Sequence, residues 1–392
     1  MPVGIYISVP FCRSKCSYCN FASGVFAHEM VAGYVRRVCD DIRRAQQTAS
    51  AMGGILERKA DSIYLGGGTP TTLTPQQIDR IFAALRQEFE IDPAAEITVE
   101  CAPGSLAPEM LDALARVGVN RVSLGVQSFV DAEAAAAGRL HTRAVVLSDI
   151  ARVRACGITN INIDLIAGLP HQTAASWRAS LEETIAAGVP HASVYMLEVD
   201  EDSRLGRELI AGGTRYHAHF VPDEDSTADF YLEACARLGG AGIAQYEISN
   251  FARPGMESKH NLKYWTRQPY VGFGLDAHSM LEGPGGAVRF STPDSLEEFM
   301  AGAPLNRIPV SSRAALEETF FLGLRLARGV DLKAVSVSFR VDAEGVFGDT
   351  IGELESSGML EREGDVVRLT SAGRLLSNEV FQRFIELPST AV

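Results

Sequence analysis

A repeated alternation of short β-rich runs and longer amphipathic stretches dominates the first two hundred residues. The β-rich runs each end in glycine, proline or a polar turn; they are Ile5–Val9, Ser62–Leu65, Glu96–Glu100, Arg121–Val126, Asn160–Ile166 and Ala192–Leu197. Helical periodicity fills most of the intervals, as in Pro75–Phe89, Pro108–Val117 and Ala174–Ala187. Strands that alternate with helices form parallel sheets with right-handed crossovers. The pattern therefore predicts an α/β fold, either a partial (β/α)6 barrel or an open doubly wound sheet.

The alternation stops after about residue 200 of the 392-residue chain. Residues 201–310 are less regular, and Gly/Pro-rich punctuation at Gly283-Pro284-Gly285-Gly286 indicates loops. Helical periodicity returns after Ser311 and ends in a hairpin pattern around Glu363-Gly364-Asp365. We therefore expect three parts: a core over 1–200, an extension over 201–310, and a mostly helical, winged-helix-like domain over 311–392.

Charge and hydropathy exclude several classes of partner. The formal net charge is −13, whereas nucleic-acid binding needs a basic face, so no nucleic-acid partner is expected. Residues 331–392 carry six Lys/Arg against eleven Asp/Glu, a net charge of −5, so the predicted winged helix is not expected to bind DNA. No run approaches the ~18 apolar residues of a membrane span, and the N-terminus has no targeting pattern. We expect a cytoplasmic protein that is not an integral membrane protein.

Three of the seven cysteines, Cys12, Cys16 and Cys19, lie within eight residues, in the loop that follows the first predicted strand. Thiolates are the usual protein ligands of iron–sulfur clusters, and three of them leave one iron of a 4Fe–4S cluster open to a small molecule. Zinc would need a fourth ligand, and no Cys or His lies between Cys19 and His28. Incidental buried cysteines are the other alternative. The remaining thiols are dispersed and expected to be small buried hydrophobes: Cys39, Cys101, Cys156 and Cys235.

Glycine and polar residues recur at or beyond the carboxyl ends of the predicted strands, where sites form in barrels of parallel strands. They are Gly67, Gly68, Thr69, Glu100, Gln127, Arg139 and Asp164. Glycine lets the backbone approach a ligand closely, a carboxylate binds an ammonium group or ribose hydroxyls, and arginine can fork onto a carboxylate. Taken singly, the glycines are more typical of an ordinary strand-to-loop turn, and each polar residue is more typical of a solvated or capping position.

The cysteine segment, Tyr6-Ile7-Ser8-Val9-Pro10-Phe11-Cys12 through Cys19-Asn20-Phe21, resembles the radical S-adenosylmethionine (SAM) motif of the coproporphyrinogen III dehydrogenase-like family. Further blocks are similar in sequence and spacing, so the resemblance covers nearly the whole chain: Leu65–Thr71, Val99–Gly104, Leu124–Phe129, Gly138–His141 and Asn162–Leu165. It implies a partial (β/α)6 TIM-type radical SAM barrel with a 4Fe–4S cluster on Cys12, Cys16 and Cys19. The implied contacts to S-adenosyl-L-methionine are Tyr6, Tyr18, Gly67, Gly68, Thr69, Glu100, Gln127, Arg139 and Asp164.

The segment His260-Asn261-x-x-Tyr264-Trp265 is similar to the motif that marks the heme chaperone branch of this family. The resemblance implies heme as cargo, a heme-accepting protein and an electron donor, both unidentified. Imidazole is a common iron ligand, so His260 is the tentative heme residue. Its rivals for that role are His278, His217 and His219, and donors for the propionates could be Lys259, Lys263 and Arg267. On residue types alone, His260 and Asn261 equally make backbone hydrogen bonds while the aromatic pair packs in the core.

Two other functions stand beside a heme chaperone: an oxygen-independent coproporphyrinogen III oxidase of porphyrin biosynthesis, and a radical SAM enzyme with an unrelated substrate. Cleavage of SAM is compatible with any of the three. Two departures disfavour the oxidase: Phe21 stands where the dehydrogenase has a further cysteine, and only eleven residues precede Cys12. A third departure is Asp276, which lies before His278 where small residues are usual, so no role is assigned to that loop.

Overall fold

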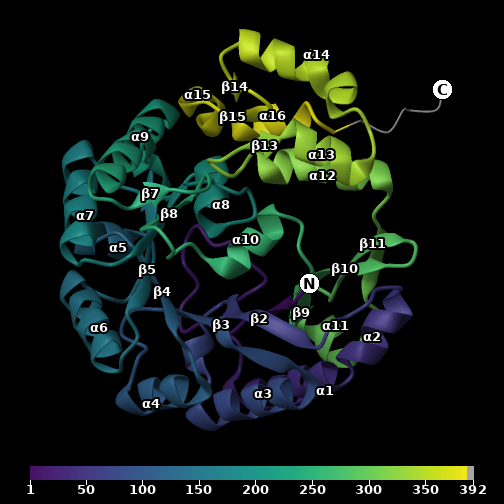
Figure 1. Ribbon diagram of the computed structural model, residues 1–392. Helices are drawn as coiled ribbons and strands as arrows, with labels where there is room; N and C mark the ends of the chain where they lie inside the picture. The colour runs from purple at the N-terminus through teal and green to yellow at the C-terminus, as the bar shows by residue number, and fades with distance from the viewer. Residues whose placement is uncertain (386–392) are drawn as a thin grey trace.

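A curved twelve-stranded sheet forms the inner wall of the protein in the computed structural model, which describes residues 1–385 (Figure 1). Its centre is a run of parallel strands that are neighbours in chain order: β1 (Val3–Val9), β2 (Lys59–Gly67), β3 (Glu90–Cys101), β4 (Arg121–Gln127), β5 (Asn160–Ala167) and β6 (His191–Met196). The order never reverses, as it would in a doubly wound sheet. The predicted partial (β/α)6 barrel is therefore confirmed, and the doubly wound alternative is wrong.

The crossovers place helices on the outside of the curved sheet (Figure 1). They contain α1 (His28–Arg43), α2 (Ala45–Met52), the 3-10 turn η1 (Pro70–Thr72), α3 (Pro75–Glu88), α4 (Pro108–Val117), α5 (Asp131–Ala136), α6 (Arg143–Ala155) and α7 (Ala174–Ala186). Local sequence fixes several ends: α3 begins at a capping box between Thr74 and Gln77, and α4 ends at Gly118, whose φ of 90° suits glycine. Because helices cover one face and side chains fill the other, β1 is almost wholly buried.

Additional elements extend both edges of the parallel core. Beyond β6 come the antiparallel β8 (Asn250–Ala252) and β7 (Ala244–Gln245); beyond β1 come the parallel β9 (Tyr270–Phe273), then β10 (His278–Gly283), β11 (Gly286–Ser291) and β12 (Asn306–Pro309). Their connections carry α8 (Arg204–Ala211), η2 (Ala218–Phe220), α9 (Glu224–Gly240), α10 (Lys259–Trp265) and α11 (Leu296–Ala301). The terminal strands β7 and β12 do not pair with each other, so the sheet stays open.

Helix α10 lies inside the curve of the sheet and not on its outer face (Figure 1). The backbone N–H of His260 donates to Glu96 Oε1 over 3.2 Å, near the start of the barrel portion of β3. The buried ammonium of Lys263 lies 2.8 Å from Asp61 Oδ1 and donates to the Pro2 carbonyl. These contacts plug the amino-terminal end of the barrel and leave its opposite end, where the strands stop, open for a site.

The C-terminal part packs around its own apolar cluster. It consists of α12 (Ser312–Gly323), β13 (Val330–Asp331), α13 (Leu332–Phe339), α14 (Ala343–Ser356), β14 (Leu360–Glu363), β15 (Val366–Leu369), α15 (Ser371–Leu375) and α16 (Ser377–Gln382). A helix pair followed by the β14–β15 hairpin confirms the predicted mostly helical, winged-helix-like fold; residues 386–392 lie outside the described part. No helix within residues 1–385 combines the length and apolar character needed to cross a membrane.

Phe320 is the centre of the C-terminal core, and its removal should destabilise this part of the protein. Its fully buried ring lies with centroids 4.2 Å from Phe347 and 5.2 Å from Phe384. Phe320→Ala leaves a cavity and should lower the free energy of unfolding by about 3–5 kcal/mol, measured by chemical denaturation. Val337→Ala is the control, because that side chain on α13 is 73% exposed; equal stability of the two variants would contradict the packing described.

Candidate functional site

Backbone hydrogen bonds hold the cysteine loop, which joins β1 to α1, in place. The Cys12 N–H donates to the Gly24 carbonyl over 2.9 Å, and the Ser17 N–H donates to the Ala137 carbonyl over 3.2 Å. Gly138 has a φ of 81°, and a Cβ there would lie 3.4 Å from Cys16 Cα. The segment that follows α5 therefore contacts the cysteine loop from the side and holds it in place.

Each thiol of the loop has a polar neighbour. Arg139 Nη1 donates to Cys16 Sγ over 3.3 Å, and Thr69 Oγ1 lies 3.9 Å from Cys12 Sγ. All seven cysteines of the chain are free thiols. Within residues 1–385 no three Cys, His, Asp or Glu side chains are close enough to share one metal ion. Ligands of a multi-iron cluster each bind a different iron, so the cysteines of such a site need not converge on one point.

A cavity of about 630 Å³ opens between the cysteine loop and the carboxyl ends of the barrel strands. It brings together nearly all of the predicted site residues: Cys12, Cys16, Tyr18, Cys19, Gly67, Gly68, Thr69, Glu100, Gln127, Arg139 and Asp164. Residues of the C-terminal part close its far side, namely Leu375, Ser377 and Asn378, with Arg325 before them. Two predicted residues, Tyr6 and His260, do not line this cavity.

The glycine-rich end of β2 packs closely against the start of the cysteine loop. A Cβ on Gly68 would lie 2.7 Å from the Val9 carbonyl oxygen, so only glycine fits there. The Gly68 N–H donates to that same oxygen over 2.9 Å, and the Thr69 N–H donates to the Phe11 carbonyl over 2.9 Å. Gly68 therefore makes its close approach to the backbone of the cysteine loop, and this contact fixes the position of Cys12.

Glu100 is a partly buried carboxyl group at the end of β3. Tyr64 Oη donates to it over 2.9 Å, and the Gly67 N–H donates over 3.1 Å. Burial, reinforced by the negative charge of Asp164, raises the pKa of Glu100 from 4.5 to about 7. A cation placed beside this carboxyl group would favour its ionised form.

Asp164 on β5 accepts a hydrogen bond over 3.0 Å from Ser123 Oγ on the neighbouring strand β4 and one over 2.7 Å from Asn162 Nδ2 on its own strand. Burial raises the pKa of Asp164, and these donors counteract the shift. Asn162 also donates to Ser193 on β6, so a polar network crosses three strands inside the barrel. The sequence analysis did not assign roles to Tyr64, Arg121, Asn162 and Ser193, which line the same cavity. Strand alternation places Asn162 on the same face of β5 as Asp164, so the sequence could have indicated that Asn162 also faces the cavity.

Gln127 reaches the cavity because β4 is irregular at its end. The pairing of β4 with β5 shifts register between Gly125 and Gln127, and Gln127 adopts a φ of 69°. A bulge re-aims a side chain, and a left-handed non-glycine residue is typical of functional sites. The side chains of Gln127 and Arg139 both lie over Gly125, where a Cβ would be about 3.2 Å from each.

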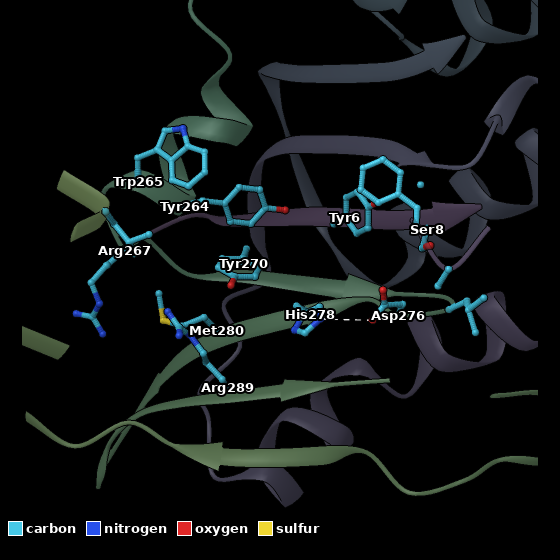
Figure 2. A pocket seen from close by; sticks show the side chains of 15 residues that line it. Tyr6, Ser8, Tyr264, Trp265, Arg267, Tyr270, Asp276, His278, Met280 and Arg289 are labelled. Atoms are coloured by element: carbon cyan, nitrogen blue, oxygen red, sulfur yellow. Dashed lines mark ion pairs between the residues drawn. The ribbon is translucent and has the colours of Figure 1, made fainter. Parts of the chain in front are cut away.

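Tyr6 lines a second cavity, of about 430 Å³ (Figure 2). This cavity lies between β1, α10 and the β9–β11 edge of the sheet, and its aromatic walls come from Tyr6, Tyr264, Trp265 and Tyr270. Gly67 and Phe21 line both cavities. The aromatic pocket therefore adjoins the cysteine-lined cavity directly. Tyr18 stays with the thiols and packs on Ile166 and Leu169.

His260 is buried on helix α10, which plugs the amino-terminal end of the barrel, and only 1% of its surface is exposed. Its Nδ1 lies 3.0 Å from Ser62 Oγ and its Nε2 lies 2.9 Å from Tyr264 Oη. Burial, together with the charge of Lys263, lowers the pKa of His260 to about 3, so the ring is neutral. Neither ring nitrogen is free in this arrangement, and iron ligation by His260 would require the ring to leave the core. Its backbone hydrogen bond to Glu96 fits the alternative, packing interpretation of the motif.

Comparison with known proteins agrees with this geometry. A model of the radical SAM superfamily matches residues 6–184, and a model of the HemN C-terminal domain matches residues 310–376. The heme chaperone HemW of Lactococcus lactis subsp. lactis (strain IL1403) is 32% identical over 388 residues, which cover 98% of this chain and 97% of that protein. The chain belongs to the HemW family of radical SAM proteins. The heme chaperone HemW of Bacillus subtilis (strain 168) is also 32% identical, with 97% and 98% covered.

A solved structure supports the fold independently of these sequences. Coproporphyrinogen III oxidase (HemN) from Escherichia coli superposes with a TM-score of 0.83 over 98% of this chain and 90% of that one, at 24% identity. At that identity the likeness concerns the fold: the partial barrel, its edge extensions and the helical C-terminal part.

Replacing Glu100 by Gln should remove a pH dependence of stability from the SAM-free protein. Because the pKa of Glu100 is about 7 in the folded state and 4.5 ordinarily, the folded state binds this proton more tightly than the unfolded chain. The free energy of unfolding of the wild type, relative to Glu100→Gln, should fall by on the order of 3 kcal/mol as pH rises from about 4.5 to about 7, then stay level. Urea unfolding across this range measures it.

Glu379→Gln is the control for the pH series, because Glu379 is exposed on α16. Its curve should run parallel to that of the wild type. If Glu100→Gln does the same, Glu100 titrates at its ordinary pKa and the raised pKa described above is wrong.

Proposed function

We propose that the chain is a heme chaperone that uses a radical SAM site, binds heme and delivers it to an acceptor protein. The observation that carries this is the near-full-length similarity to proteins named heme chaperones, on a chain whose thiol loop and strand ends meet in one cavity. Heme as cargo, the acceptor and the electron donor are parts of the proposal, the last two identified only by what they must do.

The donor set of the cavity suits a 4Fe–4S cluster. We propose that Cys12, Cys16 and Cys19 would each bind one iron of the cluster and leave the fourth iron open to a small molecule. Three free thiols on one loop that is held by backbone hydrogen bonds, all lining one cavity, support this arrangement. When bound and reduced, such a cluster supplies single electrons for the cleavage of SAM. The protein contributes the loop, whose backbone hydrogen bonds fix the thiols before any metal arrives.

The remaining cavity volume is proposed to hold SAM, contacted by Tyr6, Tyr18, Gly67, Gly68, Thr69, Glu100, Gln127, Arg139 and Asp164. All of these except Tyr6 line the cysteine cavity, and Tyr6 lines the second cavity together with the shared glycine Gly67. Glu100 and Asp164 are partly buried acceptors for an ammonium group or ribose hydroxyls. A cation bound beside Glu100 would lower its raised pKa again, so the site should release a proton when it fills near neutral pH.

The domain division and cellular location complete the proposal. A separate apolar cluster around Phe320 supports a C-terminal domain over 311–392, after a core over 1–200 and an extension over 201–310. The acidic charge of the chain supports a protein partner for the winged-helix-like domain in place of nucleic acid. Free thiols throughout support the reducing cytoplasm as its location.

Removing one cluster thiol should abolish the cluster. Cys16→Ala, reconstituted anaerobically with iron and sulfide, should lose most of the bound iron and the reduced-cluster signal in electron paramagnetic resonance. Cys156→Ala is the matched control, since Cys156 is exposed and far from the loop, and should keep both. A full cluster in Cys16→Ala would refute the ligand assignment.

The function itself is tested by two measurements on the cluster-loaded wild type. Titration with ferric heme, followed by absorbance, should show saturable binding, and bound heme should pass to an apo-hemoprotein added as an acceptor. Incubation with SAM, a reductant and coproporphyrinogen III should give no decarboxylated porphyrin, whether or not SAM is cleaved. Clear conversion of coproporphyrinogen III would favour the oxidase alternative, and failure to bind heme would refute the chaperone.

A further inference from the structure

The aromatic pocket takes no direct part in the proposed cluster site, although Tyr6 links it to the SAM-binding set. Figure 2 shows Tyr6 and Tyr264 on one side of it and the strand that carries His278 and Met280 on the other. Tyr264 and Tyr270 pack edge to face, with ring centroids 4.5 Å apart. Its volume of about 430 Å³ is in the range of small-molecule sites, and its walls suit a flat apolar ligand.

Three residues that line this pocket hold buried donors without hydrogen-bond partners within residues 1–385. They are Nε1 of Trp265, Nη2 of Arg267 and Nε of Arg289. Both guanidinium groups share one carboxylate, with Arg267 Nε 2.8 Å from Glu318 Oε2 and Arg289 Nη1 2.8 Å from Glu318 Oε1. Two cations against one anion leave a net positive charge. Because the Arg289 side chain is 35% exposed, this positively charged end of the pocket is suited to the carboxylates of a ligand.

The opposite wall offers ligands for iron. His278 opens β10 with its side chain 67% exposed, and Nε2 lies 3.5 Å from Asp276 Oδ1. The other ring nitrogen has no partner in the part of the chain that the structure describes, in contrast to His260. A carboxylate beside one nitrogen is the usual partner of a metal-binding histidine. Met280, two residues along the strand, lies on the same face.

We infer that the aromatic pocket is the seat of the heme, with His278 as an axial ligand of the iron and Arg267 and Arg289 as donors to the propionates. The inference rests on the proposed heme chaperone function and assigns residues to it. An aromatic-walled pocket, an exposed imidazole and an end with net positive charge together match a planar metal complex that carries two carboxylates. Each feature alone would fit many ligands.

The proposed heme site also gives a role to Asp276, which stands where small residues are usual in the family. Asp276 adopts a φ of 52°, which is unusual for a residue other than glycine, and its carboxylate stands beside His278. A small residue would turn the chain as readily but could not orient the imidazole. Asp276 is therefore a positioning residue for His278.

Ferric heme titration of the cluster-loaded full chain tests the inference, with absorbance and electron paramagnetic resonance as readouts. The cluster occupies the three loop thiols, so they cannot ligate heme iron. His278→Ala should bind heme roughly tenfold or more weakly and lose the spectrum of imidazole-ligated iron. His278→Tyr should instead give the spectrum of tyrosinate-ligated iron, which a merely structural effect would not produce. His28→Ala, which replaces an exposed histidine that lines neither cavity, is the control and should match the wild type.

The propionate end is tested by Arg289→Gln, which leaves Glu318 paired with Arg267. Heme affinity should fall about tenfold while the iron spectrum stays that of the wild type. Heme whose propionates are esterified should bind the wild type and Arg289→Gln equally. Equal loss of affinity for both forms of heme would overturn the propionate assignment.

The outcomes separate this inference from the function on which it rests. If the wild type binds heme but His278→Ala keeps both affinity and spectrum, the seat is wrong and the chaperone function stands. If the wild type binds no heme, both fall. If folded His260→Ala loses the spectrum of imidazole-ligated iron while His278→Ala keeps it, the iron ligand is His260 on α10 and not His278.

Discussion

The packing of the cysteine loop against the glycine-rich end of β2 is the contact on which the site depends. Gly68 can bond to the Val9 carbonyl only because it has no side chain, and the same approach sets the path of the chain into Cys12. The parallel pairing of β1 with β2 aligns Val9 with Gly67 and so fixes this contact. Everything at the mouth of the barrel is placed relative to that alignment, since the other strands follow in unbroken order.

Polar groups inside the barrel are also important, and their pairing differs between the two ends of the barrel. At the amino-terminal end the buried polar groups are paired: Lys263 with Asp61, and the ring of His260 with two hydroxyl groups. At the carboxyl end carboxyl groups lie beside one another, and the pKa of Glu100 rises accordingly. The plugged end supplies stability, while the open end retains unbalanced charge that a ligand can use.

Much of this could be predicted from the sequence, because local patterns and short motifs carried it. The alternation of strands and helices gave the barrel, and the thiols and strand-end residues meet in one cavity as expected. The place of His260 could not be predicted: its burial depends on Glu96 and Ser62, more than 160 residues away in the chain. The aromatic pocket was equally hidden, since it joins α10 to β1, β10 and β11. Asp276, dismissed as a departure, gains meaning only beside His278.

The cysteine-lined cavity is closed on one side by residues from the last folded elements, among them Leu375 and Asn378. Its first thiol is Cys12, so the wall combines nearly the first and nearly the last residues of the described chain. During synthesis on the ribosome the thiol loop emerges long before α15 and α16 do. The cavity is therefore incomplete until α15 and α16 have been synthesised, and until then the thiols lack that wall.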